Sequence, residues 1–316
     1  AKSKKGHLFL PREVLYRAAL KLLNERVPVQ ELRIRQEELE RVFQDMILGG
    51  AVVLVKDNVY LQDAFCQEDE TARRIARRMV GPLPKEDIEE ELEDVKQQFG
   101  LLPSEQQEIA VKMAFWYNTS IITGSPGTGK TTVLKMILEV YRKLHADRKI
   151  ILMAPTGRAS RRMAESTGFE DAKTMHSSLG LVGEADEERA KKEALLDAGL
   201  IIIDEFSMVD MWLAMKLFTR LGEKTKIVMV GDPDQLPSVG AGNVFHELIQ
   251  CGLIPVTVLD QIFRQSKDSL IAYNAKFINE GTSKLYYGND FVFMNSDSQE
   301  ETAEMIMELY LQEIAE

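Results

Sequence analysis

The chain has 316 residues, of which 45% are hydrophobic, and a formal net charge of −11. A chain of this length can hold two domains and bury a sizeable core. The acidic balance excludes a histone-like binder that relies on bulk positive charge, but it permits a protein that grips a few phosphates locally. No apolar run approaches the length of a membrane span, and the apolar stretch 8–10 is too short for a secretion signal. The only cysteines are Cys66 and Cys251, without metal-ligand spacing, so reduced thiols and a cytoplasmic location are expected.

The first part of the chain has the pattern of a small α+β domain. Its hydrophobic periodicity predicts two helices, over residues 11–24 and 29–49, and a hairpin of strands 51–55 and 58–61 that turns at Asp57 and Asn58. Helices followed by a hairpin predict a winged-helix-like domain over residues 1–67. Modules of this kind either bind DNA or pack against a neighbouring domain, and the sequence favours neither.

A helical linker is predicted over residues 68–98. Four arginines lie on its first helix, namely Arg73, Arg74, Arg77 and Arg78. The segment from Lys85 to Asp94 has the acidic composition of a helix start. We interpret both charged groups as solvated helix faces.

A glycine-rich loop with the spacing Gly124-x-x-x-x-Gly129-Lys130-Thr131 follows an apolar strand and precedes a helix-capable run over residues 133–144. Glycines let consecutive backbone N–H groups curl around a triphosphate, and the helix directs its positive dipole end at the same anion. Lys130 can neutralise the β/γ oxygens, and Thr131 can offer its hydroxyl to Mg²⁺. The loop therefore predicts a site for ATP and Mg²⁺.

Two further apolar runs end in polar residues. Residues 200–203 lead into Asp204 and Glu205, and residues 226–231 lead into a polar turn that contains Gln235. In an open parallel sheet, the ligand crevice lies outside the carboxyl ends of the strands. Asp204 is therefore the predicted metal carboxylate and Glu205 the predicted general base for the attacking water. The amide of Gln235 is suited to sensing a γ-phosphate.

A third run, over residues 151–154, is followed by a tight turn, and Arg161 and Arg162 come just beyond it. A basic helix start after a strand end suits a phosphodiester backbone. An ordinary strand-to-helix turn with solvated arginines explains the same residues equally well.

The order of motifs resembles superfamily 1 DNA helicases, in particular the RecD-like branch, of the exodeoxyribonuclease V α-subunit type, with its TraA-type relatives. The resemblance spans about residues 100–280 and is carried by LPSEQQEIAV (102–111), GSPGTGKTT (124–132), APTGRAS (154–160), TMHSSLG (174–180), DEFSMVD (204–210), GDPDQLPSVGAGN (231–243) and LDQIFRQ (259–265). It implies an α/β fold with the parallel sheet of a RecA-like P-loop NTPase. The first motor lobe would cover residues 99–256, and the incomplete start of a second lobe would cover residues 257–316. The implied activity is ATP-dependent movement on single-stranded DNA, 5′→3′, in recombination or repair.

The resemblance also assigns roles to individual positions. Gln107 would contact the adenine, with Gln106 as the alternative because the register is ambiguous by one residue. Arg264 would face the γ-phosphate and stabilise charge in the transition state. The implied nucleotide-binding set is Gln107, Gly124, Pro126, Gly127, Thr128, Gly129, Lys130, Thr131 and Thr132. The implied DNA-binding set is Thr156, Arg158, Thr174 and His176, with contacts to the backbone rather than to bases. For His176, a structural histidine at a helix start is a serious alternative.

Two departures from the family pattern limit what the resemblance implies. The later motifs of the second lobe do not occur before Glu316, so we expect this chain alone not to unwind DNA. Relatives often place a strand-separating hairpin where residues 184–193 have a charged, helix-forming composition, which predicts a solvated helix or linker instead. A nucleotide-switched DNA-binding module with little turnover is the alternative function. Single-stranded DNA is the implied partner, and recombination or single-strand-binding proteins could join it; no membrane is expected.

Overall fold

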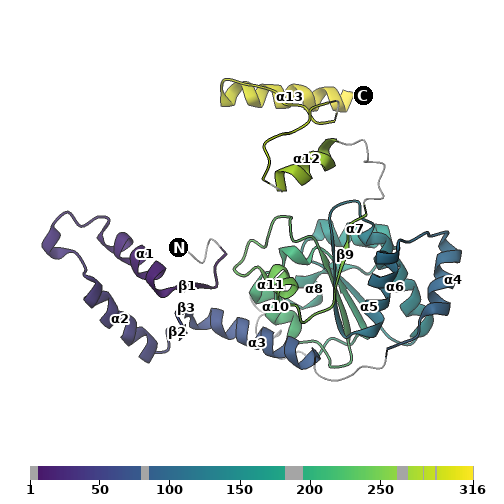
Figure 1. Ribbon diagram of the computed structural model, residues 1–316, viewed down its shortest axis with the longest axis horizontal. Coiled ribbons are helices and arrows are strands. Elements are labelled where there is room, and N and C mark those ends of the chain that lie inside the picture. The colour runs from purple at the N-terminus through teal and green to yellow at the C-terminus, as the bar shows by residue number, and fades with distance from the viewer. Residues whose placement is uncertain are drawn as a thin grey trace. The chain divides into compact units, whose positions relative to one another are not determined.

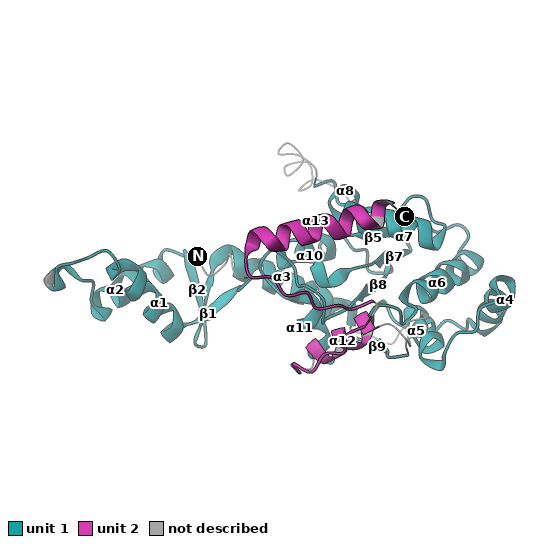
Figure 2. Ribbon diagram, turned by 90° about the horizontal axis from the view of Figure 1, so that it is seen from above, with its two compact units in different colours: residues 1–261 teal, residues 262–316 magenta. Residues whose placement is uncertain are grey.

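The computed structural model describes residues 6–79, 85–181, 195–261, 270–279, 281–288 and 290–315. The chain divides into two compact units, residues 1–261 and residues 262–316, which Figures 1 and 2 show in ribbon form. The first unit holds an N-terminal module and a large α/β lobe. None of the helices in the described part of the chain combines the length and the apolar character that a membrane crossing needs.

The lobe is built on a six-stranded sheet in the order β6-β5-β7-β8-β4-β9, and every neighbouring pair is parallel. The strands are β4 (Thr119–Gly124), β5 (Ile150–Ala154), β6 (Lys173–Thr174), β7 (Leu200–Ile203), β8 (Lys226–Gly231) and β9 (Val256–Leu259). All residues of β4, β7 and β8 are buried. Burial on both faces explains why these strands are continuous apolar runs and not alternating ones.

Helices cover both faces of this sheet, so the lobe has two apolar cores (Figure 1). Successive strand residues point to opposite faces, so Leu200 and Ile202 join one core and Ile201 and Ile203 the other. The first core is covered by α4 (Glu89–Phe99), α5 (Glu105–Trp116), α6 (Lys130–Leu144) and α7 (Gly157–Thr167). The second is covered by α3 (Gln62–Met79), α8 (Met175–Ser178), η3 (Phe206–Met208), α10 (Met211–Phe218) and α11 (Val244–Gln250).

The N-terminal module pairs two helices with a three-stranded antiparallel sheet in the order β1-β3-β2. Its elements are β1 (Phe9–Pro11), α1 (Arg12–Asn24), η2 (Gln30–Leu32), α2 (Gln36–Leu48), β2 (Val52–Val55) and β3 (Asn58–Leu61). Its small core consists of Tyr16, Phe43, Val52 and Val59. The predicted fold class, a RecA-like parallel α/β sheet behind a small α+β domain, is confirmed.

Two details of this module differ from the sequence prediction. The single helix expected over residues 29–49 is divided, because Arg35 is extended and forms a capping box with Glu38 at the start of α2. Upstream of this cap, the side chain of Asn24 bonds both the N–H and the carbonyl of Ile34 at 2.8 and 3.0 Å. The hairpin turns one residue earlier than expected, at Lys56 and Asp57, and Lys56 adopts a φ of 54°.

Helix α3 runs from the hairpin into the lobe and packs against α10. Arg73 lies at its surface and pairs with an acid one turn earlier, as a solvated face predicts. For Arg78, the interpretation as part of a solvated face is wrong. Its guanidinium donates to the carbonyls of Asn118 and Gly222 at 3.0 and 2.7 Å, and also to the carbonyl of Thr225. Burial lowers the pKa of Arg78 to about 10.

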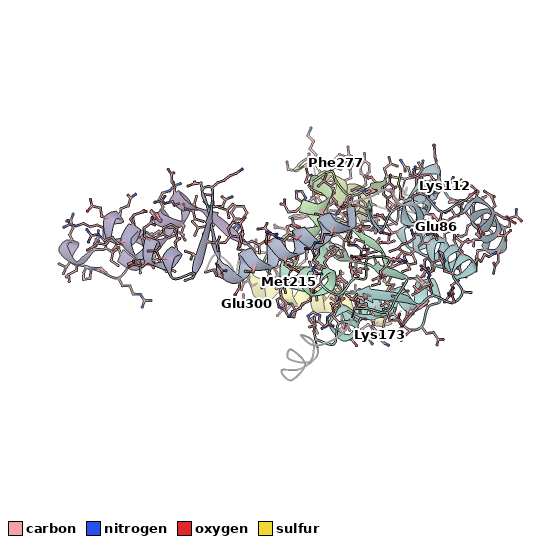
Figure 3. All side chains as sticks on the ribbon, turned by 90° about the horizontal axis from the view of Figure 1, so that it is seen from below. Glu86, Lys112, Lys173, Met215, Phe277 and Glu300 are labelled. Carbon is pink, nitrogen blue, oxygen red and sulfur yellow. The ribbon has the colours of Figure 1, made fainter. Side chains whose placement is uncertain are left out.

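The segment before α4 was also interpreted as a solvated acidic face, but Glu86 in this segment makes contacts with the lobe. Glu86 bonds His145 Nε2 at 2.9 Å and lies 3.3 Å from Lys226 Nζ. The same Nζ donates to the carbonyl of Phe115 at 2.6 Å. Figure 3 shows Glu86 on the α4–α5 side of the lobe, together with Lys112, which pairs with an acid of α4. These contacts close the amino edge of the sheet, where β8 begins.

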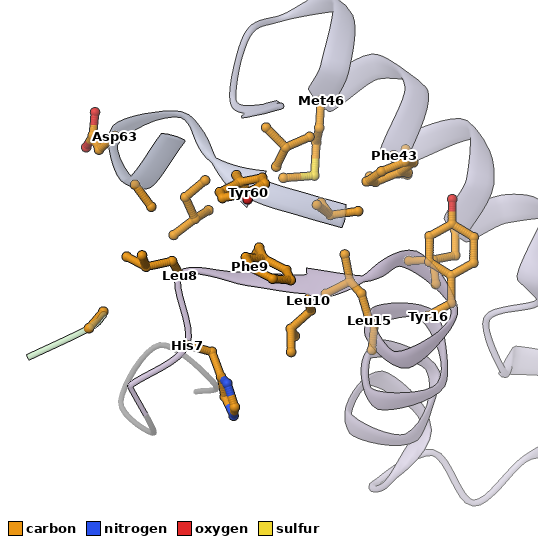
Figure 4. A pocket seen from close by; sticks show the side chains of 18 of the residues that line it. His7, Leu8, Phe9, Leu10, Leu15, Tyr16, Phe43, Met46, Tyr60 and Asp63 are labelled. Carbon is orange, nitrogen blue, oxygen red and sulfur yellow. The ribbon is translucent and has the colours of Figure 1, made fainter. Parts of the chain in front are cut away.

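A cavity of about 510 Å³ lies in the N-terminal module (Figure 4). Its walls are mostly apolar side chains of β1, α1, α2 and β3, including Phe9, Leu15 and Met46. Ala241, from the loop after β8, also lines it. This cavity is separate from the glycine-rich loop at the carboxyl edge of the large sheet.

The second unit contains α12 (Leu270–Asn279) and α13 (Gln299–Ala315). Asn274 is fully buried, and its amide bonds the N–H and the carbonyl of Tyr286 at 2.8 and 2.6 Å. Tyr273, Phe277 and Tyr286 form an aromatic cluster around this contact. The bonds of Asn274 therefore hold the segment after α12 against the helix.

Candidate nucleotide-binding site

The glycine-rich loop joins β4 to α6 in the geometry that an anion site requires. Gly127 and Gly129 have φ angles of 86° and 83°, a region that residues with a Cβ rarely adopt. Gly129 is also the N-cap of α6, and no side chain caps that helix start. The first N–H groups of α6 therefore stay available to an anion, which the helix dipole also favours.

Gly124 is required for a different reason. A Cβ at this position would lie 2.6 Å from the carbonyl oxygen of Leu259 and 2.7 Å from Thr128 Oγ1. Both distances are too short for a real side chain. The first glycine of the motif thus permits β4 to pack against its edge neighbour β9.

Thr128 holds the loop from inside. Its side chain is 1% exposed, and its hydroxyl donates to the carbonyl of Ser125 at 2.9 Å. Its own carbonyl accepts from Gln107 Nε2 at 3.2 Å. The Oε1 of Gln107 accepts from the N–H of Ser104 at 3.0 Å, which completes a capping box for α5. Both ends of the Gln107 amide are therefore engaged within the protein, whereas the buried Oε1 of Gln106 has no partner among the described residues.

Lys130 lies among three carboxylates from two other strand ends. Its Nζ donates to the carbonyls of Gly124 and Ser125, the second at 3.1 Å. Burial lowers the pKa of Lys130, while the charges of Asp232, Asp204 and Glu205 act in the opposite direction. Because β4, β7 and β8 are parallel, their carboxyl ends meet here. This edge therefore brings a cation and three acids to the phosphate loop.

The acid pair after β7 is half-buried, and Glu205 has a strained backbone. Burial raises the pKa of Asp204, and burial followed by the charge of Asp204 raises the pKa of Glu205. Glu205 has a φ of 54°, unusual for a residue with a side chain, and its N–H donates to Asp204 Oδ1 at 2.9 Å. A left-handed non-glycine residue costs on the order of 1–3 kcal/mol and persists where its surroundings fix it. Such strain next to raised carboxyl pKa values is typical of functional sites.

Asp232 was not predicted as a site residue from the sequence, and Arg162 was expected beside a phosphodiester backbone or as a solvated arginine. Asp232 is 3% exposed and accepts from the N–H of Asp234 at 3.1 Å and from Gln235 Nε2 at 3.2 Å. Arg162 of α7 acts electrostatically on Lys130, Asp204 and Glu205. The signal for Asp232 was its place directly after a buried strand, as for Asp204. The sequence placed Arg162 at a basic helix start, but its proximity to the acid pair depends on how α7 packs.

The donor set fits a magnesium ion that is shared with a nucleotide. Thr131 is exposed at the start of α6, and Asp204 follows β7, which β8 separates from β4 in the sheet. Within the described ranges, no cluster of three or more histidine, cysteine or acidic side chains could hold a metal by itself. Magnesium is commonly held by one or two carboxylates together with phosphates and water, so two protein ligands suffice.

The four residues expected to contact DNA come together at the carboxyl ends of β5 and β6, where Ala154 pairs with Thr174. The hydroxyls of Thr156 and Thr174 accept from backbone N–H groups at 3.2 and 3.1 Å and cap α7 and α8. Arg158 and His176 are exposed.

Arg264 and the charged run 184–193 lie outside the described residues.

The chain is similar to a known domain family and to known helicase proteins. A domain family described as "AAA domain" matches residues 107–241, which include the glycine-rich loop, the acid pair and Gln235. A RecBCD enzyme subunit RecD from Buchnera aphidicola is 28% identical over 274 residues, covering 77% of this chain and 44% of the relative. An ATP-dependent RecD2 DNA helicase from Deinococcus radiodurans is 29% identical over 287 residues, covering 89% of this chain and 39% of the relative.

The sequence is RecD-like. A further RecD subunit, from Haemophilus influenzae, is 37% identical over 165 residues, which cover 46% of this chain and 26% of that protein. The chain thus spans less than half the length of these RecD relatives. Among solved structures, a Pif1 helicase from Candida albicans aligns with 58% of this chain and 45% of its own, at a TM-score of 0.45 and 26% identity.

Proposed function

We propose that this chain is the ATP-hydrolysing part of a RecD-like DNA helicase or translocase that acts on single-stranded DNA. One observation carries the proposal: Lys130, Asp204, Glu205 and Asp232 converge on the glycine-rich loop. A cation, a half-buried acid pair and free helix N–H groups are the parts that phosphoryl transfer to water requires. The match of residues 107–241 to the AAA-domain family and the similarity of the chain to RecD subunits support the same assignment.

In this proposal each side chain has one task. Lys130 exchanges its loop carbonyl partners for the β/γ oxygens of ATP, which are stronger acceptors because they are charged. Glu205 accepts a proton from the attacking water, and its raised pKa brings it closer to the pH at which a base works well. Gln235, held by Asp232, positions its amide near the γ-phosphate. Mg²⁺, held by Thr131 and Asp204, would neutralise phosphate charge when bound.

For adenine recognition, the hydrogen bonds favour Gln106 over Gln107. Adenine presents its exocyclic amino group as a donor, and the buried Oε1 of Gln106 is an acceptor without a partner among the described residues. Gln107 would have to release Thr128 and Ser104 first. We therefore assign Gln107 to holding the phosphate loop and Gln106 to the base.

The proposed DNA contact is the carboxyl edge of β5 and β6. Arg158 and His176 are exposed there, and the caps formed by Thr156 and Thr174 fix the two helix starts. Backbone contacts of this kind carry no sequence preference. Movement in the 5′→3′ direction, a cytoplasmic location, cooperation with other recombination proteins, and division of the chain into residues 1–67, 68–98, 99–256 and 257–316 remain part of the proposal.

The test is the ATPase rate of this chain with and without single-stranded DNA, with duplex of the same length as the control. The proposal expects hydrolysis that requires magnesium and increases with single strands. Binding of ATP and DNA without turnover would favour a nucleotide-switched binding module instead. If neither nucleotide nor DNA binds, the proposal is wrong.

A further inference from the structure

Three side chains from two separate elements meet on the surface beside the proposed DNA contact. His176 comes from α8, and Trp212 and Lys216 come from α10. The rings of His176 and Trp212 have centroids 6.3 Å apart and an interplanar angle of 34°. Lys216 Nζ lies over the indole at 5.5 Å from its centroid. His176 is exposed, and the other two side chains are half-buried.

The sequence of α10 explains why this group faces outward. Asp210 caps the helix by accepting from the N–H of Leu213 at 2.8 Å, which fixes where α10 begins. Trp212 and Lys216 are four residues apart, so they share one helix face. Leu213, Leu217 and the other core residues of α10 occupy the opposite face and are buried. The Trp212 and Lys216 pair therefore lies at the outer border of the core.

This combination of groups matches the chemistry of single-stranded nucleic acid. Every base has a flat π-face that can stack on an aromatic ring, whatever the sequence, and each phosphate adds a negative charge that a lysine can neutralise. An indole is the largest aromatic surface that a protein offers. Lys216 already lies close to that ring, so a phosphate adjoining a stacked base would be within its reach.

His176, Trp212 and Lys216 lie next to the residues of the proposed DNA contact. Thr174 lies at the end of β6, and a Cβ on Gly157 at the start of α7 would be 4.0 Å from its side chain. His176 follows two residues later and touches Trp212. An exposed strip thus leads from α7 through α8 to α10, along the carboxyl ends of the outer strands.

We infer that His176, Trp212 and Lys216 form a stacking platform for one base of single-stranded DNA, with Lys216 contacting the adjoining phosphate. This inference rests on the proposed function, because it places the platform at the end of the same DNA path. It assigns a DNA contact to α10, which no motif in the sequence indicates. The platform accepts any base, so it adds affinity without sequence preference.

Tryptophan fluorescence tests the platform directly. The chain has two tryptophans, and Trp116 lies at the end of α5 with Lys85 Nζ 4.6 Å from its ring centroid. In a Trp116→Phe variant, only Trp212 emits. Titration with a thymine oligonucleotide of about 12 residues, within the usual site sizes, is expected to quench that emission. DNA binding is followed in parallel by the anisotropy of a dye on the oligonucleotide.

The DNA affinities of substituted proteins distinguish base stacking on Trp212 from its packing against the core. Trp212→Leu keeps an apolar side chain against the core but removes the π-face, and it should weaken binding to single strands roughly 5- to 100-fold. Trp212→Phe retains a ring and should lose much less. Lys216→Met should reduce the slope of log affinity against log salt by about 0.7, the value for one phosphate contact. Lys224→Met, at an exposed position before β8, removes the same charge and should leave the slope unchanged.

The outcomes distinguish this inference from the proposed function. If the chain binds single strands but Trp212 is not quenched, or if Trp212→Leu binds as tightly as the parent, the platform is wrong and the proposed function stands. If no single-stranded DNA binds at all, both are wrong. Melting temperatures of the variants identify any loss of affinity that comes from unfolding alone.

Discussion

Lys130 is half-buried and Lys226 is buried at opposite edges of one sheet, and we expect them to serve different purposes. Lys226 begins β8 at the amino edge, where its Nζ donates to the carbonyl of Phe115 at 2.6 Å and lies 3.3 Å from Glu86. Lys130 follows β4 at the carboxyl edge, where its bonds within the described part of the chain go to loop carbonyls and three acids act on it at longer range. Burial lowers the pKa of both.

The difference between the two edges lies in how completely the buried charges are paired. At the amino edge, Arg78 and Lys226 donate directly to carbonyls and to a carboxylate, so this edge is closed. At the carboxyl edge, Asp204 and Glu205 carry raised pKa values and Glu205 has a left-handed backbone. Incompletely satisfied charge and strain are retained in proteins where a ligand uses them. We therefore expect the amino edge to contribute stability and the carboxyl edge to carry the chemistry.

The largest expected effect is on turnover at the carboxyl edge. Lys130→Ala removes the cation of the phosphate loop, and loss of one such charge in a water-excluded site typically reduces turnover by roughly 10²–10³-fold. Stability should change little, because Lys130 makes only bonds to its own loop. ATPase rate and melting temperature are measured on one preparation. Undiminished turnover would show that the loop is not the reaction site.

Glu205→Gln tests whether Glu205 is the general base for the attacking water. The amide keeps the shape of the side chain but cannot accept the proton from water, so hydrolysis should fall by roughly 10²-fold or more. Nucleotide binding should persist, since Lys130, Thr131 and Asp204 remain. Equilibrium binding and single-turnover hydrolysis distinguish the two effects. Simultaneous loss of binding would mean that Glu205 holds the metal or the fold.

At the amino edge the expected effect is on stability. Arg78→Ala leaves the carbonyls of Asn118, Gly222 and Thr225 without their charged donor, which should lower the free energy of unfolding by about 2–4 kcal/mol. Arg77→Ala, at an exposed position on the same helix, should stay within about 0.5 kcal/mol. Chemical denaturation measures both. Equal stability of the two variants would remove the argument for a closed edge.

The smallest expected effect is a gain in stability at the carboxyl edge. Burial raises the pKa of Asp204, so the folded state binds more protons than the unfolded state above the ordinary value of 3.8, and stability falls as pH rises through that window. Asp204→Asn removes this effect and should stabilise the protein at neutral pH by on the order of 1 kcal/mol.

The gain from Asp204→Asn should shrink as the pH falls and Asp204 becomes protonated in the parent protein. Asp234→Asn, an exposed acid nearby, is the control and should give no gain. Thermal melts at several pH values measure the effect. A destabilised Asp204→Asn at neutral pH would show that the carboxylate has a structural partner.

The sequence predicts the strands and their polar ends well, because buried parallel strands are continuous apolar runs and the acids stand directly after them. Asp204 and Glu205 were identified in this way and Lys130 from the spacing of the glycine-rich loop, and the structure brings the three together. What local pattern cannot show is packing. Arg78 has the same sequence setting as Arg77, and only the position of α3 against the lobe gives it carbonyl partners.

The same limit applies within the candidate site. Adjacent glutamines are equivalent in the sequence, but the capping box uses Gln107 and leaves the Oε1 of Gln106 without a described partner. Arg162 reaches the acid pair only through the packing of α7. The division of residues 29–49 into two helices depends on a side-chain contact from Asn24, which no periodicity reveals.

We propose that Lys130 binds nucleotide at the carboxyl edge of the sheet and that Lys226 stabilises the fold at the amino edge. Titration of Mg-ATP by calorimetry into Lys130→Met and Lys226→Met tests it with the same substitution at both edges. The account predicts that Lys226→Met, where folded, binds ATP like the parent but melts at a changed temperature, while Lys130→Met keeps its melting temperature and loses most of its affinity. Parent-like affinity in Lys130→Met, or loss of affinity in a folded Lys226→Met, would contradict it.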